Sequence, residues 1–151
     1  MLDATLAWLH FLAIFGFTAC LFAEAAFYAR SLPPQTLRRL SSIDAAYGIL
    51  ALAVIVTGVA HLIFSPKTPA FYLHDAIFWT KIGLFLAVGL ISIVPTVHLL
   101  RLRGASAQYS LPVEIEDRTY RSMRLCLTCE LVLLAFIPLC AAFMARGYGY
   151  L

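Results

Sequence analysis

The sequence predicts an all-α integral membrane protein built as one antiparallel four-helix bundle. Of its 151 residues, 62% are apolar and 13% are charged, whereas soluble domains carry about 25% charged residues. The apolar residues fall into four blocks of membrane-spanning length rather than into amphipathic stripes. The connections between the blocks are short, which favours antiparallel neighbours. We therefore interpret residues 1–151 as a single transmembrane domain.

Four segments are long enough to cross a bilayer. They cover about residues 4–29, 43–64, 77–100 and 120–146. At a rise of about 1.5 Å per residue, each can span a hydrocarbon core of about 30 Å. The first segment is too long for the apolar region of a signal peptide, and Asp3 rather than a basic cluster precedes it. We therefore expect this segment to remain in the protein as a helix.

The arginines divide unequally between the connections. The first connection carries three and the third carries five, namely Arg30, Arg38, Arg39, Arg101, Arg103, Arg118, Arg121 and Arg124. The second connection carries Lys67 and Asp75. By the positive-inside rule, the first and third connections face the cytoplasm of a bacterial inner membrane, and both termini are periplasmic. Because the basic residues are scattered through loops, we expect no nucleic-acid binding.

Two histidines lie near the predicted outer side of the membrane. His10 is about two turns into the first span, and His61 is about one turn from the end of the second. A histidine in hydrocarbon costs free energy unless it has a partner, which makes it a functional-site hypothesis by default. Since the two spans are antiparallel neighbours, their facing sides bring the two rings to one depth. Two imidazoles at one depth are typical axial ligands of a low-spin haem b.

Three further cations fall within roughly 10 Å of the same depth. Lys81 is about one turn into the third span, Arg146 closes the fourth, and His74 lies in the second connection. Haem propionates need such cations. Gly58 lies three residues before His61, nearly on the same helix face, and would let a flat ring approach the backbone. These residues complete a predicted haem b site.

Other interpretations of the same residues remain open. A membrane histidine can be a hydrogen-bonded packing residue, and Lys81 can extend its amine outward to the membrane interface. His74 can simply be solvated. A copper or zinc site that uses the histidines is a further alternative, although such a site normally has more ligands within reach.

A second group of polar residues lies toward the predicted cytoplasmic side. Glu24 follows His10 by fourteen residues, which is nearly four turns, so both project from one face about 21 Å apart. Asp44 and Tyr47 open the second span, and Glu130 lies inside the fourth. An acid in hydrocarbon must be protonated or paired.

Two roles suit these four residues. One is an ion-pair belt that locks the helices, for which the available cations are Arg39, Arg121 and Arg124. The other is a proton path or a quinone-headgroup site. Asp44 also has a plainer interpretation, as an early-turn residue of a helix whose N-cap is Ser41 or Ser42.

His98 closes the third span on the cytoplasmic side. It is a candidate ligand of a second haem, because imidazole is a common axial ligand. The sequence offers it no partner histidine on that side, and Met123 is the nearby thioether. A second haem therefore remains an alternative to a purely structural role.

Four runs of the sequence resemble a bacterial family of four-helix inner-membrane proteins, the domain of unknown function DUF2214. They are Leu9-His10-Phe-Leu-Ala-Ile, Asp44-Ala-Ala-Tyr47-Gly48, Tyr72-Leu-His-Asp-Ala-Ile-Phe78-Trp79-Thr-Lys81 and Ser92-Ile-Val-Pro95-Thr. The resemblance covers nearly the whole chain. It implies the four-helix topology but no particular activity.

A second resemblance covers mainly the first span and the start of the third. Residues 9–10 and 19–22 are similar to the histidine-bearing first helix of HemJ-type protoporphyrinogen oxidases, and Lys81 is similar to that family's lysine after a tryptophan. This resemblance implies that His10 is a haem ligand and Lys81 a functional cation. The sequence departs from the family at Ala26, where the family has an arginine, and at Phe17, where it has a tryptophan.

The residues together predict a membrane haem b protein of the cytochrome b type that transfers electrons, with a membrane quinol as a suggested donor. An enzyme alternative is a HemJ-like porphyrinogen oxidase, a membrane oxidoreductase. A third alternative is a haem-free structural or transport protein whose polar residues only lock the helices. The apolar lateral faces would also allow a homodimer in the lipid.

Overall fold

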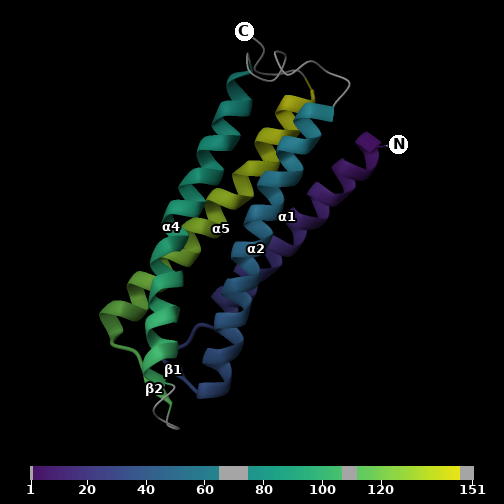
Figure 1. The fold of residues 1–151 in the computed structure, drawn as a ribbon. Coiled ribbons are helices and arrows are strands. Elements are labelled where there is room, and N and C mark those ends of the chain that lie inside the picture. The colour runs from purple at the N-terminus through teal and green to yellow at the C-terminus, as the bar shows by residue number, and fades with distance from the viewer. Residues whose placement is uncertain (1, 65–74, 107–111, 147–151) are drawn as a thin grey trace.

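The computed structural model describes residues 2–64, 75–106 and 112–146. These residues form four long helices and one two-stranded sheet (Figure 1). The helices are α1 (Leu2–Phe27), α2 (Pro34–Phe64), α4 (Ala76–Ser106) and α5 (Asp117–Ala145). The strands are β1 (Ser31–Leu32) and β2 (Val113–Glu114).

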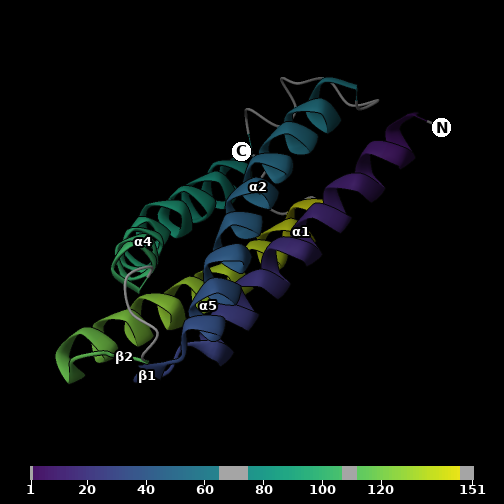
Figure 2. The ribbon, with the colours of Figure 1, turned by 60° about the horizontal axis from the view of Figure 1, so that its bottom comes forward.

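The four helices form an antiparallel bundle. α1 packs chiefly against α2, and α4 chiefly against α5, while fewer contacts join α2 to α4 and α1 to α5. Both views place α1 and α4 on opposite sides of the bundle (Figures 1 and 2). All four helices are long and apolar enough to cross a membrane. The expected all-α membrane bundle is therefore confirmed.

The outer surface of the bundle is apolar. Phe15 and Ile49 are each 70% exposed, and Leu90 is 67% exposed. Water would penalise an apolar surface this extensive, whereas lipid tails accept it. The exposed side chains therefore face the lipid, and the helices associate through close packing and polar contacts between them.

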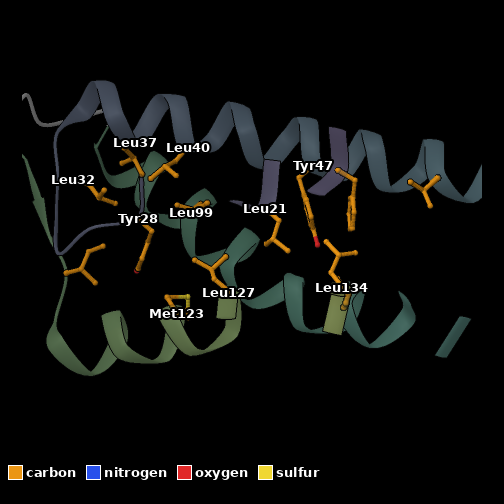
Figure 3. Close-up of a cluster of buried hydrophobic side chains, with 14 of the residues drawn as sticks. Leu21, Tyr28, Leu32, Leu37, Leu40, Tyr47, Leu99, Met123, Leu127 and Leu134 are labelled. Carbon is orange, nitrogen blue, oxygen red and sulfur yellow. The ribbon is translucent and has the colours of Figure 1, made fainter. Parts of the chain in front are cut away.

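The two ends of the bundle differ in packing. We call the end with β1 and β2 the sheet end, and the end with the start of α1 and the close of α5 the terminal end. Most of the buried side chains in Figure 3 lie between the middle of the bundle and the sheet end, including Tyr28, Leu40 and Leu127. Toward the terminal end, α1 diverges from α2 in both ribbon views. The sheet end is therefore the better packed half.

The small sheet joins the connection after α1 to the segment before α5. β1 and β2 pair antiparallel, with Ser31 opposite Glu114 and Leu32 opposite Val113. The Ser31 hydroxyl donates to Glu114 Oε1 at 2.5 Å, and Arg30 lies 2.9 Å from the Asp117 carboxylate. This pairing ties the α1–α2 hairpin to the start of α5.

Helix α2 begins earlier than the predicted span. It starts at Pro34, a residue whose fixed φ suits the first turn of a helix. Ser41 and Ser42 therefore do not cap the helix; their hydroxyls donate to the carbonyls of Leu37 and Arg38, each at 3.0 Å. Asp44 lies well inside α2, so its interpretation as an early-turn residue is wrong.

Close packing of α1 on α2 requires a small residue at Gly16. A Cβ atom added there would lie 3.1 Å from Leu50 Cδ1. One residue further along α1, the Phe17 ring stacks on the Tyr47 ring with their centroids 4.4 Å apart. The two helices are thus in close contact around Gly16 and Phe17.

We predict that Gly16→Ile lowers the free energy of unfolding by about 1–3 kcal/mol, because the added atoms overpack the α1–α2 contact. Gly48→Ile is the matched control, since nothing lies within 4 Å of a Cβ added at Gly48. Thermal unfolding of the two variants in detergent measures the difference. Equal melting temperatures would contradict the close contact at Gly16.

Candidate functional site

The structure fixes the orientation of His10. Its Nδ1 lies 2.9 Å from the hydroxyl oxygen of Thr57 on α2. That hydroxyl donates its own hydrogen to the Ala53 carbonyl at 2.6 Å. Because a hydroxyl has one hydrogen, its oxygen must accept from His10, which places the imidazole proton on Nδ1 and leaves a lone pair on Nε2. A neutral imidazole with Nδ1–H anchored is the form that binds metal ions through Nε2.

Gly58 makes room for the His10 ring itself. A Cβ atom added to Gly58 would lie 3.1 Å from His10 Cε1. Gly58 therefore lets a flat ring approach the α2 backbone, as expected, and in the structure that ring is the imidazole of His10. The space above the Gly58 backbone is filled by the imidazole, because α1 and α2 pack closely enough to insert it there.

His61 and Lys81 lie close to His10. Both are half-buried and both interact electrostatically with the His10 ring. His61 follows Thr57 by one turn of α2, and Lys81 comes from α4, where its Nζ lies 5.5 Å from the centre of the Phe78 ring. Three of the predicted site residues therefore gather at the terminal end of the bundle.

Arg146 and His74 are the other two predicted contacts of the haem propionates. Arg146 is exposed and caps the C-terminus of α5 at the same end of the bundle. His74 lies outside the described residues. The buried Asp75, which the sequence analysis noted only for its charge, accepts a hydrogen bond from the Ile77 amide at 2.8 Å and so caps α4 just before Lys81.

A cluster of acids is buried in the other half of the bundle. Glu24 on α1, Asp44 on α2 and Glu130 on α5 are 3%, 7% and 0% exposed. The Tyr47 hydroxyl donates to Glu130 Oε2 at 3.1 Å, and the Thr96 hydroxyl on α4 donates to Asp44 Oδ1 at 2.6 Å. We call Glu24, Asp44, Tyr47 and Glu130 the carboxyl cluster; all four residues were singled out from the sequence.

The predicted ion-pair belt does not form among the described residues. Arg124 donates to the backbone carbonyl of Ala25, and Arg39 and Arg121 are exposed. One carboxyl oxygen of Glu24 and one of Glu130 are buried without a hydrogen-bond partner. The guanidinium groups remain near the sheet end of the bundle, where water can solvate them, so the acids are left without a cation.

The described part of the chain contains no group of three or more His, Cys, Asp or Glu residues arranged to hold a metal ion. The carboxyl cluster therefore lacks the geometry of a metal site, although its acids lie close enough to interact electrostatically. Uncharged carboxyl groups are then the state that a low-dielectric interior favours.

His98 pairs with a tyrosine that sequence reasoning did not single out. The Tyr28 hydroxyl lies 3.0 Å from His98 Nε2, and the Tyr28 ring stacks on Tyr120 with 5.8 Å between centroids. Burial raises the pKa of Tyr28 to about 12, so at neutral pH this hydroxyl keeps its proton and can donate it to Nε2. That nitrogen is engaged by Tyr28 in the structure, and a second haem on His98 stays a prediction.

Two spaces in the protein meet at His98. A small cavity of about 10 Å³, room for about one water, lies between Glu24 and His98, with Met123 in its wall. A more open groove of about 360 Å³ lies on the other side, lined by Val97, His98, Arg101 and Met123 among others. His98 therefore separates the buried carboxyl cluster from the surface.

We predict that Thr96→Val lowers the free energy of unfolding by about 1–3 kcal/mol, because it leaves the buried Asp44 carboxyl without its donor. Thr80→Val is the matched control, since the Thr80 side chain is exposed and donates only to its own helix. Chemical or thermal unfolding in detergent gives the comparison. A loss no larger than that of Thr80→Val would show that the Thr96 hydroxyl does not support Asp44.

A comparison with known proteins identifies the family to which this chain belongs. A family model described as a predicted membrane protein (DUF2214) matches residues 2–149. Neither the curated proteins nor the solved structures contain a match to the chain. The matched residues include all four helices and both groups of buried polar side chains. The chain therefore belongs to the DUF2214 family of predicted membrane proteins.

Proposed function

We propose that this protein is a membrane haem b protein that transfers electrons, with His10 as an axial ligand. The observation that carries the proposal is the fixed orientation of the His10 ring. The Thr57 hydroxyl oxygen accepts a hydrogen bond from the Nδ1–H group, with 2.9 Å between oxygen and nitrogen, so the Nε2 lone pair is available for iron. An axial histidine usually has its second nitrogen held in this way, which fixes the tautomer and strengthens the ligand.

The neighbours of His10 supply the other parts of the proposed site. His61 is the second ligand, since it interacts electrostatically with His10 from the adjacent helix. Lys81, Arg146 and His74 are the proposed contacts of the propionate groups. When bound, haem supplies a reversible one-electron centre, and two imidazole ligands keep its iron low-spin. The protein's contribution is to orient the ligands and to exclude water from them.

We also propose the direction in which the protein spans a bacterial inner membrane. The sheet end is the cytoplasmic end and both termini are periplasmic, because arginines concentrate at the sheet end. They include Arg30, Arg38, Arg39, Arg101, Arg103, Arg118 and Arg121. The groove beside His98 and Arg101 is largely apolar and opens to the outside of the bundle, so it suits a membrane quinol as the electron donor.

A porphyrinogen oxidase is the second candidate. The observation that favours it is the proximity of Lys81 to His10, because a lysine beside a haem could bind the carboxylates of a porphyrinogen. Anaerobic incubation of the haem-loaded protein with a porphyrinogen and a quinone separates the candidates. An oxidase forms fluorescent porphyrin, and an electron carrier does not.

Protein purified from haem-replete cells is expected to show a Soret band and sharp reduced α and β bands. The haem should leave on acid–acetone extraction, because the sequence has no Cys-x-x-Cys-His attachment motif. His10→Ala and His61→Ala should each abolish the low-spin spectrum. Gly48→Ala is the control, since Gly48 faces open space away from both histidines.

Two outcomes would contradict this proposal. A colourless and fully folded preparation would leave the haem-free alternative, in which the polar residues only hold the helices together. If the low-spin spectrum survives His61→Ala but not His10→Ala, the protein binds haem through His10, and His61 is not the second ligand.

A further inference from the structure

We propose that Glu24 carries an exchangeable proton and that His98, through the small cavity between them, connects this proton to the sheet end of the bundle. The proposal goes beyond electron transfer and does not depend on haem. It rests on the burial of Glu24, on the cavity beside it and on the position of His98 between that cavity and the surface groove.

Glu24 has the surroundings of a proton-holding carboxyl. Its side chain is 3% exposed, and Oε1 has no hydrogen-bond partner. Arg124 on α5 donates to the backbone carbonyl of Ala25, the residue after Glu24. The titratable groups that face Glu24 are Cys20 on its own helix, Asp44 and Tyr47 on α2, Glu130 on α5, and Tyr28 and His98 across the cavity. None of these groups supplies a fixed positive charge, so a bound proton is the neutralising cation.

A proton suits this place better than a metal ion does. The described residues offer no set of three ligand side chains with metal-binding geometry. Glu130 and Asp44 already accept hydrogen bonds from Tyr47 and Thr96. A carboxylic acid needs only one acceptor for its own proton, and a single water in the cavity of about 10 Å³ can provide it.

His98 is placed to pass the proton between the cavity and the groove. Its ring lines both spaces, and Arg101 lines the groove on the same side. The Tyr28 hydroxyl first turns away from Nε2; the imidazole then takes up a proton from solvent at that nitrogen and releases its Nδ1 proton to the cavity water, as histidine can near neutral pH. The water then protonates the Glu24 carboxylate. These steps move one proton from solvent to Glu24, and the same steps in reverse return it to solvent.

The path is closed toward the terminal end. Phe17, Leu21 and Val88 are 2%, 0% and 0% exposed, and the Phe17 ring packs on Tyr47 at 4.4 Å and on Phe85 at 5.9 Å. These side chains form an apolar layer between the carboxyl cluster and His10. The proton on Glu24 therefore exchanges with one side of the membrane only.

Infrared spectroscopy of the full-length protein in lipid vesicles tests the proposal. Protonated buried carboxyls absorb as a C=O band above the amide I band, and transfer to D₂O shifts this band as the protons exchange. Glu24→Gln is expected to remove part of the band. His98→Ala is expected to slow the exchange of that part by about 100-fold, the lower end of the effect of a positioned proton carrier, and added imidazole should restore the rate.

The control is Met123→Leu, which keeps the volume of a cavity wall residue that does not titrate. It should leave the exchange rate unchanged. If His98→Ala fails to fold, Met123→Phe serves instead, because it fills the cavity while keeping every titratable group, and it should slow the exchange. The proposal would be overturned if the carboxyl band stayed intact in Glu24→Gln. It would also be overturned if the exchange rate did not change in His98→Ala or Met123→Phe, or if Met123→Leu slowed the exchange as much as they do.

Discussion

The structure depends on a constraint that the bilayer imposes, since polar side chains in its core must find partners within the protein. Among the described residues, three such pairs of side chains join different helices. His10 on α1 bonds to Thr57 on α2, Asp44 on α2 to Thr96 on α4, and Tyr47 on α2 to Glu130 on α5. Because hydrophobic association between helices is weak in lipid, these pairs select which faces of the helices meet. α2 takes part in all three.

An apolar layer divides the bundle into two regions of different chemistry. Phe17 and Leu21 lie on α1 between His10 and Glu24, and Tyr47 lies beneath the Phe17 ring. On the terminal side of this layer, the His10 imidazole is held by Thr57 and lies near Lys81 and His61. On the other side, carboxyl groups are buried without a cation. The proposed haem and proton-exchange sites therefore occupy separate halves of one small protein.

The sequence predicted the features that follow from segment length and depth. It identified the four helices, the gathering of His10, His61 and Lys81, and the carboxyl cluster, because helical rise places these residues at common depths. It missed Thr57, Thr96 and Tyr28, since a hydroxyl in an apolar run shows no periodic signal. It placed arginines beside the acids, whereas the tertiary packing leaves Arg124 on a backbone carbonyl. The pairing of β1 with β2 joins two short segments far apart in sequence, so local patterns cannot reveal it.

The central claim is that His10 and His61 both bind one haem iron. Electron paramagnetic resonance of the oxidised full-length protein tests this claim most directly, because the signal reports the ligand field of the iron. The account predicts a low-spin ferric signal in the native protein and its conversion to a high-spin signal in both His10→Ala and His61→Ala. A high-spin signal in the native protein, or a low-spin signal that persists in His10→Ala, would contradict the account.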